Sequence, residues 1–165
     1  MTSYTNTLKQ ADIFDQLTLT QLEMISNICE EKVFNADEII FKEGANSDEL
    51  YIIAQGEVDI QVNPALVTNQ PSEKFKAVTI ATLRRGQSFG EIALVDLGVR
   101  SATTLSKQDN TRLLVIPRDK LMLLCDTYPP LGYRLMQNLA ADLALKMRNT
   151  DLRIRQELLF GKNIK

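Results

Sequence analysis

One stretch of the chain, residues 88–104, combines residue types that together suit the binding of an anion. Gly90 lets the backbone approach a ligand closely and tolerates a positive φ. Residues 91–94 suit a short helical turn, whose first N–H groups have no partner within the helix. Arg100, nine positions after Glu91, adds a forked and permanently charged donor that matches a phosphate. Because Glu91 would repel an anion, its presence indicates a ligand that also offers hydroxyl groups, as a ribose does.

Residues 89–94 and 100–102 read Phe-Gly-Glu-Ile-Ala-Leu and Arg-Ser-Ala, and this pattern resembles the phosphate-binding cassette of cyclic nucleotide-binding domains. The resemblance extends from about Phe14 to the C-terminal helix. It implies that Glu91 holds the ribose 2′-hydroxyl, and that Arg100 holds the cyclic phosphate together with backbone N–H groups. The expected ligand-binding residues are Phe89, Gly90, Glu91, Ile92, Ala93, Arg100, Ser101 and Ala102 around the sugar and phosphate, with Ile60, Ile80 and Ala81 against the base.

The sequence specifies the base of the expected ligand less well than it specifies the phosphate. Bacterial gene regulators that this chain resembles place a Thr-Ser pair on the long helix, where it meets the adenine amine. This chain has Lys146-Met147 there, and Asn149-Thr150 follows about one turn later. Ser101 after the arginine is common in cyclic AMP binders of the bacterial branch, whereas cyclic GMP binders often have Thr. We therefore expect cyclic AMP, with cyclic GMP as the alternative.

The amino-acid composition excludes several classes of catalytic and metal site. A chain of 165 residues, 44% hydrophobic and 24% charged, is typical of one globular domain. It contains no histidine and two cysteines, Cys29 and Cys125, which we expect to be reduced core thiols. Histidine-dependent catalysis, most zinc sites, and the iron–sulfur and haem sites of related sensors are thereby excluded. We expect a binding protein without a metal or cofactor rather than an enzyme.

The N-terminal part is expected to be helical. Residues 1–12 are polar and are expected to be loosely ordered, with one helical turn around Leu8, and residues 13–31 form a helical segment. Apolar residues at helical spacing predict a helix from about 19 to 30. Two capping boxes fit its start, Thr20 with Glu23 and Thr18 with Gln21.

Residues 32–117 have the pattern of a β jelly roll. Val58, Ile60 and Val62 alternate with polar residues, as in a half-buried strand. Short β-branched and aromatic runs alternate with turn residues, which favours a sandwich or barrel. The runs are 33–34, 38–42, 50–54, 57–62, 77–83, 101–106 and 112–116, and the segment 63–76 is expected to be a long loop of unknown role.

Residues 118–160 are expected to form C-terminal helices, a short one at 119–126 and a long one from about 129 to 160. Leu135, Leu139, Leu143 and Met147 form one apolar ridge of the long helix, and Met136, Ala140 and Ala144 form its neighbour. One ridge can cover the barrel and the other can pair with a second copy, so we expect a homodimer through this helix. A helix that lies back on its own domain is the alternative.

The charge distribution and other sequence features indicate which kinds of partner the chain can have. Residues 146–165 hold six basic and two acidic residues, a net +4 against −6 elsewhere, which fits either a solvated helix end or an acidic protein partner. The chain shows no apolar run of membrane-spanning length and no signal peptide pattern, so we expect it in the cytoplasm. It has no helix-turn-helix segment after the long helix, so we do not expect direct DNA binding. We expect a sensor that signals through its C-terminal helices, or a fragment of a longer chain; the alternative is a protein-interaction module that binds no cyclic nucleotide.

Overall fold

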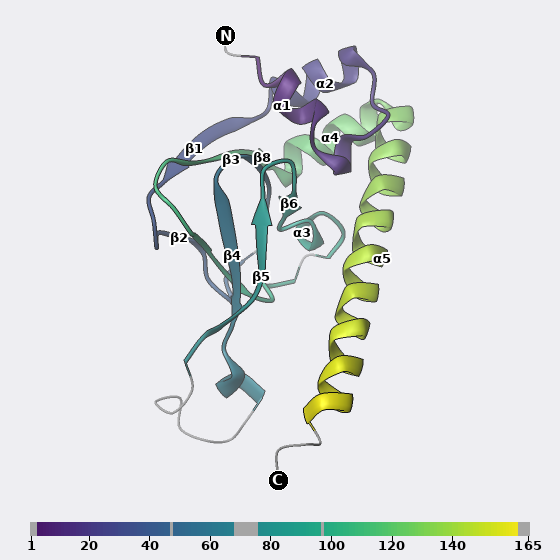
Figure 1. The fold of residues 1–165 in the computed structure, drawn as a ribbon. Coiled ribbons are helices and arrows are strands. Elements are labelled where there is room, and N and C mark those ends of the chain that lie inside the picture. Colours follow the sequence, from purple (N-terminus) through teal and green to yellow (C-terminus); the bar gives the residue numbers. More distant parts are fainter. Residues whose placement is uncertain (1–2, 47, 68–75, 97, 162–165) are drawn as a thin grey trace.

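Two four-stranded antiparallel sheets form the centre of the molecule (Figure 1). The computed structural model describes residues 3–46, 48–67, 76–96 and 98–161, so most of the expected 63–76 loop lies outside the described residues, as do Lys162 and Lys165. The first sheet has the order β1 (Glu30–Phe34), β8 (Thr111–Pro117), β3 (Glu49–Gln55) and β6 (Ser88–Phe89). The second has the order β2 (Ile39–Phe41), β7 (Thr103–Ser106), β4 (Glu57–Val62) and β5 (Val78–Arg84), and η2 (Pro64–Val67) follows β4. This arrangement confirms the predicted jelly roll.

The N-terminal segment is more ordered than its sequence predicts. It forms α1 (Thr5–Lys9) and the 3₁₀ turn η1 (Asp12–Phe14), which precede α2 (Leu19–Ser26). The expectation of a loosely ordered 1–12 is therefore wrong for residues 5–9, although the helical turn around Leu8 is confirmed. The physical reason is burial: the Leu8 side chain is fully buried in the core, and the Tyr4 N–H donates to Ser26 Oγ of α2 at 2.8 Å.

The helix α2 is shorter than its apolar pattern predicts. Its capping box is formed by Thr18 and Gln21, so the alternative start at Thr20 with Glu23 is wrong. The helix ends at Ser26 because the chain must turn into β1, which begins at Glu30 and pairs with β8. The sheet therefore starts two residues before the predicted boundary at residue 32.

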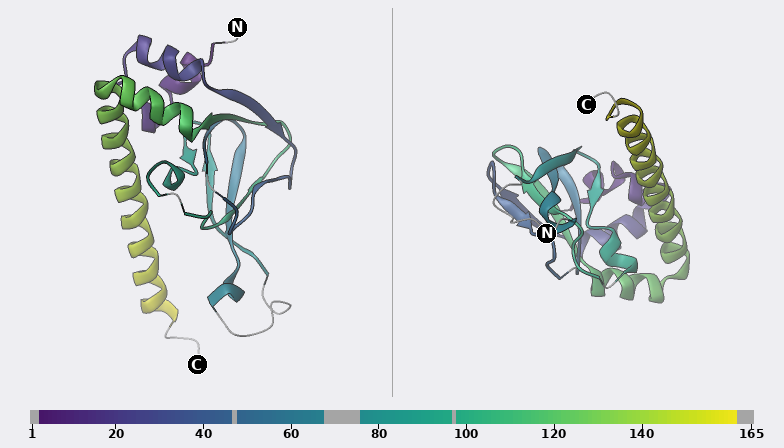
Figure 2. Two further views of the ribbon diagram at one scale, coloured as in Figure 1. Left: turned by 180° about the vertical axis from the view of Figure 1, so that it is seen from behind. Right: turned by 90° about the horizontal axis from the view of Figure 1, so that it is seen from below.

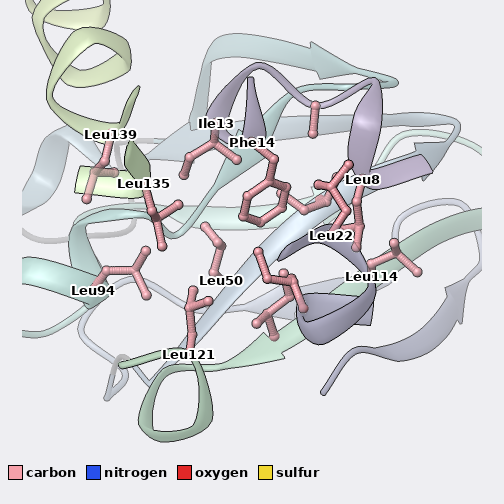
Figure 3. Packing of buried hydrophobic residues seen from close by; sticks show 14 residues of the cluster. Leu8, Ile13, Phe14, Leu22, Leu50, Leu94, Leu114, Leu121, Leu135 and Leu139 are labelled. Atoms are coloured by element: carbon pink, nitrogen blue, oxygen red, sulfur yellow. The ribbon is translucent and has the colours of Figure 1, made fainter. Parts of the chain in front are cut away.

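The first sheet is covered on both faces, which gives the molecule two apolar clusters. Successive residues of β3 point to opposite faces, so Leu50 and Ile52 join the cluster beneath the helices, while Tyr51 and Ile53 join the cluster between the sheets. This explains why residues 50–53 are buried without interruption. Figure 3 shows the first cluster, where Leu50 and Leu114 meet Leu8, Ile13, Phe14, Leu22, Leu94, Leu121, Leu135 and Leu139.

The C-terminal helices begin and end close to the predicted residues. α4 spans Arg118–Thr127 and α5 spans Pro129–Phe160, with two prolines at its start that suit a first helical turn. Gly132 lets the two helices meet, because a Cβ on it would lie 2.9 Å from the Cys125 carbonyl oxygen. α5 starts beside α4 and then runs along one side of the sheets past the short helix α3 (Ile92–Val95) (Figures 1 and 2).

The two halves of α5 differ in burial. Leu135 and Leu139 of the predicted ridge are buried in the first cluster, but Met147 of the same ridge is 67% exposed. Of the second ridge, Met136 packs partly against the cluster, while Ala140 and Ala144 are exposed. Among the described residues, no helix is long and apolar enough to cross a membrane. Cys29 and Cys125 are unbridged and partly buried, as predicted for reduced thiols, and burial raises the pKa of Cys29 to about 12.

Candidate functional site

A cavity of about 390 Å³ lies between the second sheet, the segment from β6 to β7, and α5. This volume is within the range of small-molecule sites. Its lining includes ten of the predicted site residues, namely Ile60, Ile80, Ala81, Phe89, Gly90, Glu91, Ile92, Arg100, Ser101 and Ala102. The remaining one, Ala93, belongs to α3, and its side chain lies outside what the structure describes. Residues from distant parts of the chain are thus brought together, although their roles in binding stay predictions.

Gly90 forms the turn between β6 and α3, and no other residue fits there without strain. Its φ is +75°, in the left-handed region that side chains disfavour. A Cβ at this position would lie 2.6 Å from Arg100 Nη1 and 3.0 Å from the carbonyl oxygen of Glu49. The turn therefore allows the Arg100 guanidinium to lie directly against the backbone.

Arg100 is buried, with 5% of its surface exposed. Its backbone is fixed by two 2.8 Å hydrogen bonds, from its N–H to Ala45 and from the Gly44 N–H to its carbonyl. Its guanidinium lies 4.1 Å from the centroid of the Phe41 ring, and Nη2 donates to the Glu49 carbonyl oxygen at 3.1 Å. Burial lowers the pKa of Arg100, but a guanidinium remains charged at neutral pH.

The buried charge of Arg100 has no direct counter-ion in the described part of the chain. No carboxylate oxygen there lies within 4.0 Å of the guanidinium nitrogens. Nε is buried and has no hydrogen-bond partner among the described residues. A buried cation is costly without a paired anion, so this arrangement is suited to an anion supplied from outside the chain.

Glu91 lies at the other side of the turn and is 6% exposed. Its carboxylate is paired with Lys146 of α5, whose Nζ lies 2.5 Å from Oε1. The same ammonium lies 2.8 Å from Asp142 Oδ2, one helical turn earlier, and donates to the Ser88 carbonyl oxygen at 3.2 Å. Desolvation lowers the pKa of Lys146, but pairing with the two carboxylates outweighs it, so the net shift is upward.

α5 completes the wall of the cavity through the side chains of Asp142, Leu145, Lys146, Asn149, Thr150 and Arg153. Arg153 donates from Nη1 to the carbonyl oxygen of Ile80, which links α5 to β5. Thr150 Oγ1 donates to the Lys146 carbonyl oxygen at 3.0 Å, and the lone pairs of its oxygen can still accept. Asn149 and Thr150, which the sequence places about one turn after Lys146, therefore both reach the cavity.

Sequence reasoning missed several residues of the site. Phe41 and Tyr51 surround Arg100, and Tyr51 stacks on Phe89 with ring centroids 5.0 Å apart. In the sequence, each of them looks like an ordinary core aromatic residue, so no sequence feature indicates that it lies at the site. Asp142 and Lys146 are four positions apart on a helix, and this spacing could have indicated that they form an ion pair with each other. It does not indicate that they face Glu91. The described residues contain no cluster of potential metal ligands.

Comparison with known proteins identifies the family. The sequence model of the family described as cyclic nucleotide-binding domain matches residues 31–128 of this chain, which is more than half of its length. The cyclic AMP receptor protein of Thermus thermophilus is 28% identical over 147 residues, covering 89% of this chain and 62% of the receptor. Human cGMP-dependent protein kinase 2 is 28% identical over 116 residues, covering 70% of this chain and 14% of the kinase. The chain thus spans less than two thirds of the length of these relatives.

A solved structure supports the same assignment. A putative cyclic nucleotide-binding protein from Geobacter metallireducens aligns with a TM-score of 0.71 and 25% identity, covering 89% of this chain and 99% of that one. The chain belongs to the cyclic nucleotide-binding domain family.

Proposed function

We propose that this member of the cyclic nucleotide-binding domain family binds cyclic AMP in the cavity beneath α5 and passes the signal on through its C-terminal helices. The cyclic phosphate lies on Arg100 and on the backbone N–H groups of Ala93, Ser101 and Ala102. Glu91 accepts from the ribose 2′-hydroxyl, and the apolar wall packs on the base. The chain acts as a regulatory domain rather than as an enzyme, and we expect it in the cytoplasm.

The observation that carries this proposal is that the buried guanidinium of Arg100 has no directly paired carboxylate among the described residues. Its guanidinium is buried against Phe41, donates to a backbone carbonyl and has no carboxylate within 4.0 Å among the described residues. A protein rarely keeps such a charge unless an anion pairs with it. A phosphate that carries one negative charge and offers several acceptor oxygens meets this need, because an arginine fork can bond two of them.

The apolar part of the cavity wall supports a flat, apolar group in the ligand besides the phosphate. Ile60, Ile80, Ala81 and Leu83 come from the neighbouring strands β4 and β5 and line the cavity together. Such a surface packs well on a purine but does not distinguish adenine from guanine. The choice of cyclic AMP rests on Ser101, and the named relatives, a cyclic AMP receptor and a cGMP-dependent kinase, leave both bases open.

The output surface in this proposal is the second half of α5. Leu145, Leu152 and Leu159 recur every seven residues and are each more than half exposed. Such a repeat favours a parallel pairing of two helices. We therefore propose a homodimer through α5, or docking of a protein partner on the same surface, with Leu145 linking this surface to the cavity that it also lines.

A thermal-shift titration with cyclic AMP, cyclic GMP and AMP tests the proposal. A ligand that binds the folded chain alone stabilises it by RT ln(1 + [L]/Kd), about 2.7 kcal/mol at a hundredfold excess over Kd. We expect a rise in Tm with cyclic AMP, a smaller rise with cyclic GMP, and none with AMP. A larger rise with cyclic GMP would contradict the choice of base. No rise with any of them would contradict nucleotide binding and would favour an interaction module that uses the exposed face of α5.

A further inference from the structure

Lys146 is the side chain of α5 that makes an ion pair with the cassette among the described residues. Its ammonium contacts Glu91, Asp142 and the Ser88 carbonyl oxygen at 2.5, 2.8 and 3.2 Å. Two of these acceptors belong to the strand and turn that precede α3, and the third belongs to α5 itself. The side chain therefore fixes a defined position of Glu91 relative to the helix.

The Glu91 carboxylate needs such a partner. It is 6% exposed, and a buried carboxylate without a positive neighbour is strongly disfavoured in its charged form. Lys146 thus supplies a positive charge that pairs with this buried carboxylate and a contact that orients it.

The ion pair leaves space for the ligand. The cavity of about 390 Å³ exists with the Lys146–Glu91 pair in place, and both side chains form part of its wall. Lys146 bonds one oxygen of the carboxylate, Oε1, and a carboxylate has about four lone-pair sites. A sugar hydroxyl can therefore donate to Glu91 while Lys146 stays bound to it.

We propose that Lys146 is a positioning residue for recognition of the sugar: it holds Glu91 toward the 2′-hydroxyl of the ligand and ties this contact to α5. Asp142, one turn earlier on the same helix, also pairs with the ammonium and so restrains it. This inference rests on the proposed function. It adds that discrimination between ribose and deoxyribose depends on a residue of the long helix as well as on the cassette.

The experiment compares the affinities of cyclic AMP and 2′-deoxy cyclic AMP by isothermal titration calorimetry. A site built to bond a hydroxyl rejects the analogue that lacks it, so the wild-type chain should favour cyclic AMP by about tenfold or more. Lys146→Met, which keeps the length of the side chain and removes its charge, should reduce this ratio to about threefold or less. Lys146→Arg should keep most of the ratio, because it restores a cation within reach of Glu91.

Two further variants keep the test decisive. Arg148→Met removes the same charge from an exposed residue of the same helix and should leave the ratio unchanged. Asp142→Asn keeps Lys146 and loosens its restraint, so it should lower the ratio less than Lys146→Met does, and it replaces that variant if Lys146→Met does not fold.

Three outcomes would overturn the inference. An equal loss of affinity for both nucleotides would show a merely structural role for Lys146. Tighter binding of cyclic AMP by Lys146→Met would show that the ammonium competes with the sugar. If the wild-type chain bound neither nucleotide, the proposed function itself would fail and this inference with it, which distinguishes the two failures.

Discussion

The two ends of the cavity are built from different parts of the fold. At the cassette end, Gly90 and Arg100 are fixed by backbone geometry: a left-handed turn, two backbone hydrogen bonds and an aromatic ring against the guanidinium. At the helix end, the wall belongs to a single helix, and side chains such as Lys146 and Arg153 connect it to the sheets. Glu91 and Arg100 of the cassette end are buried, whereas most of α5 beyond residue 144 is exposed.

Under the proposed function, this difference separates two tasks. Backbone-defined geometry cannot adjust without breaking the turn, so it suits a group of constant shape such as a cyclic phosphate. A helix held by a few polar contacts can shift when those contacts change, so it suits the transmission of a signal. The two ends of the cavity are connected by the ion pair between Glu91 of the cassette end and Lys146 of the helix end.

The largest effect that we expect concerns the anchoring of α5. Leu135→Ala should lower the free energy of unfolding by about 2–5 kcal/mol, because it leaves a hole in the core where the helix packs. Met147→Ala, on the same ridge but 67% exposed, should change it by less than about 0.5 kcal/mol. Urea denaturation of both variants measures the difference. Equal losses would mean that the second half of α5 is packed as firmly as the first.

A smaller effect is expected at the cassette end from Gly90→Ala. A left-handed φ costs about 1–2 kcal/mol for a residue with a Cβ, and the clash with Arg100 and the Glu49 carbonyl adds to it. Gly44→Ala is the matched control, because φ there is +81° and the new Cβ would have nothing within 4 Å. Thermal unfolding should therefore show a greater loss for Gly90→Ala. A similar loss in both variants would show that the close approach of Arg100 does not matter.

Part of this comparison was predictable from the sequence. The alternation of Val58, Ile60 and Val62 and the turn residues between the runs specify the strands, and the spacing from Gly90 to Arg100 specifies the cassette. These features depend on neighbours in the sequence. The helical turn around Leu8 was predicted, but the burial of Leu8 in the core was not, because that burial depends on contacts between α1 and residues of α2 and η1.

The contact between Lys146 and Glu91 could not be predicted for the same reason. The two residues are 55 positions apart, and their meeting depends on the direction in which α5 leaves α4. The position of the Arg100 guanidinium also depends on long-range pairing, since it donates to the backbone carbonyl oxygen of Glu49, 51 positions away. Residue types thus indicated the candidate binding groups, while packing decides how these side chains are held.

The smallest effect that we expect is a dependence on pH at the helix end. The folded-state pKa of Lys146 lies above its ordinary value of 10.5, so its pairing with Glu91 and Asp142 stabilises the folded chain fully below that value. The stabilisation is lost as the pH rises through the raised pKa. The difference in Tm between the wild-type chain and Lys146→Met should therefore stay constant from pH 7 to about pH 10 and shrink above it. A difference that changes between pH 7 and pH 9 would contradict this origin.

The central claim is that Arg100 awaits the anionic group of a cyclic nucleotide, and calorimetric titration of wild-type and Arg100→Ala chains with cyclic AMP tests it most directly. A charge-assisted hydrogen bond contributes roughly 1.5–3 kcal/mol, so the substitution should weaken binding by about tenfold or more. Because the substitution also removes the contacts of Arg100 with Phe41 and the Glu49 carbonyl oxygen, the Tm of both chains without ligand is measured beside the affinity. Equal affinity in the two proteins would contradict the account, since the cyclic phosphate would then be held elsewhere.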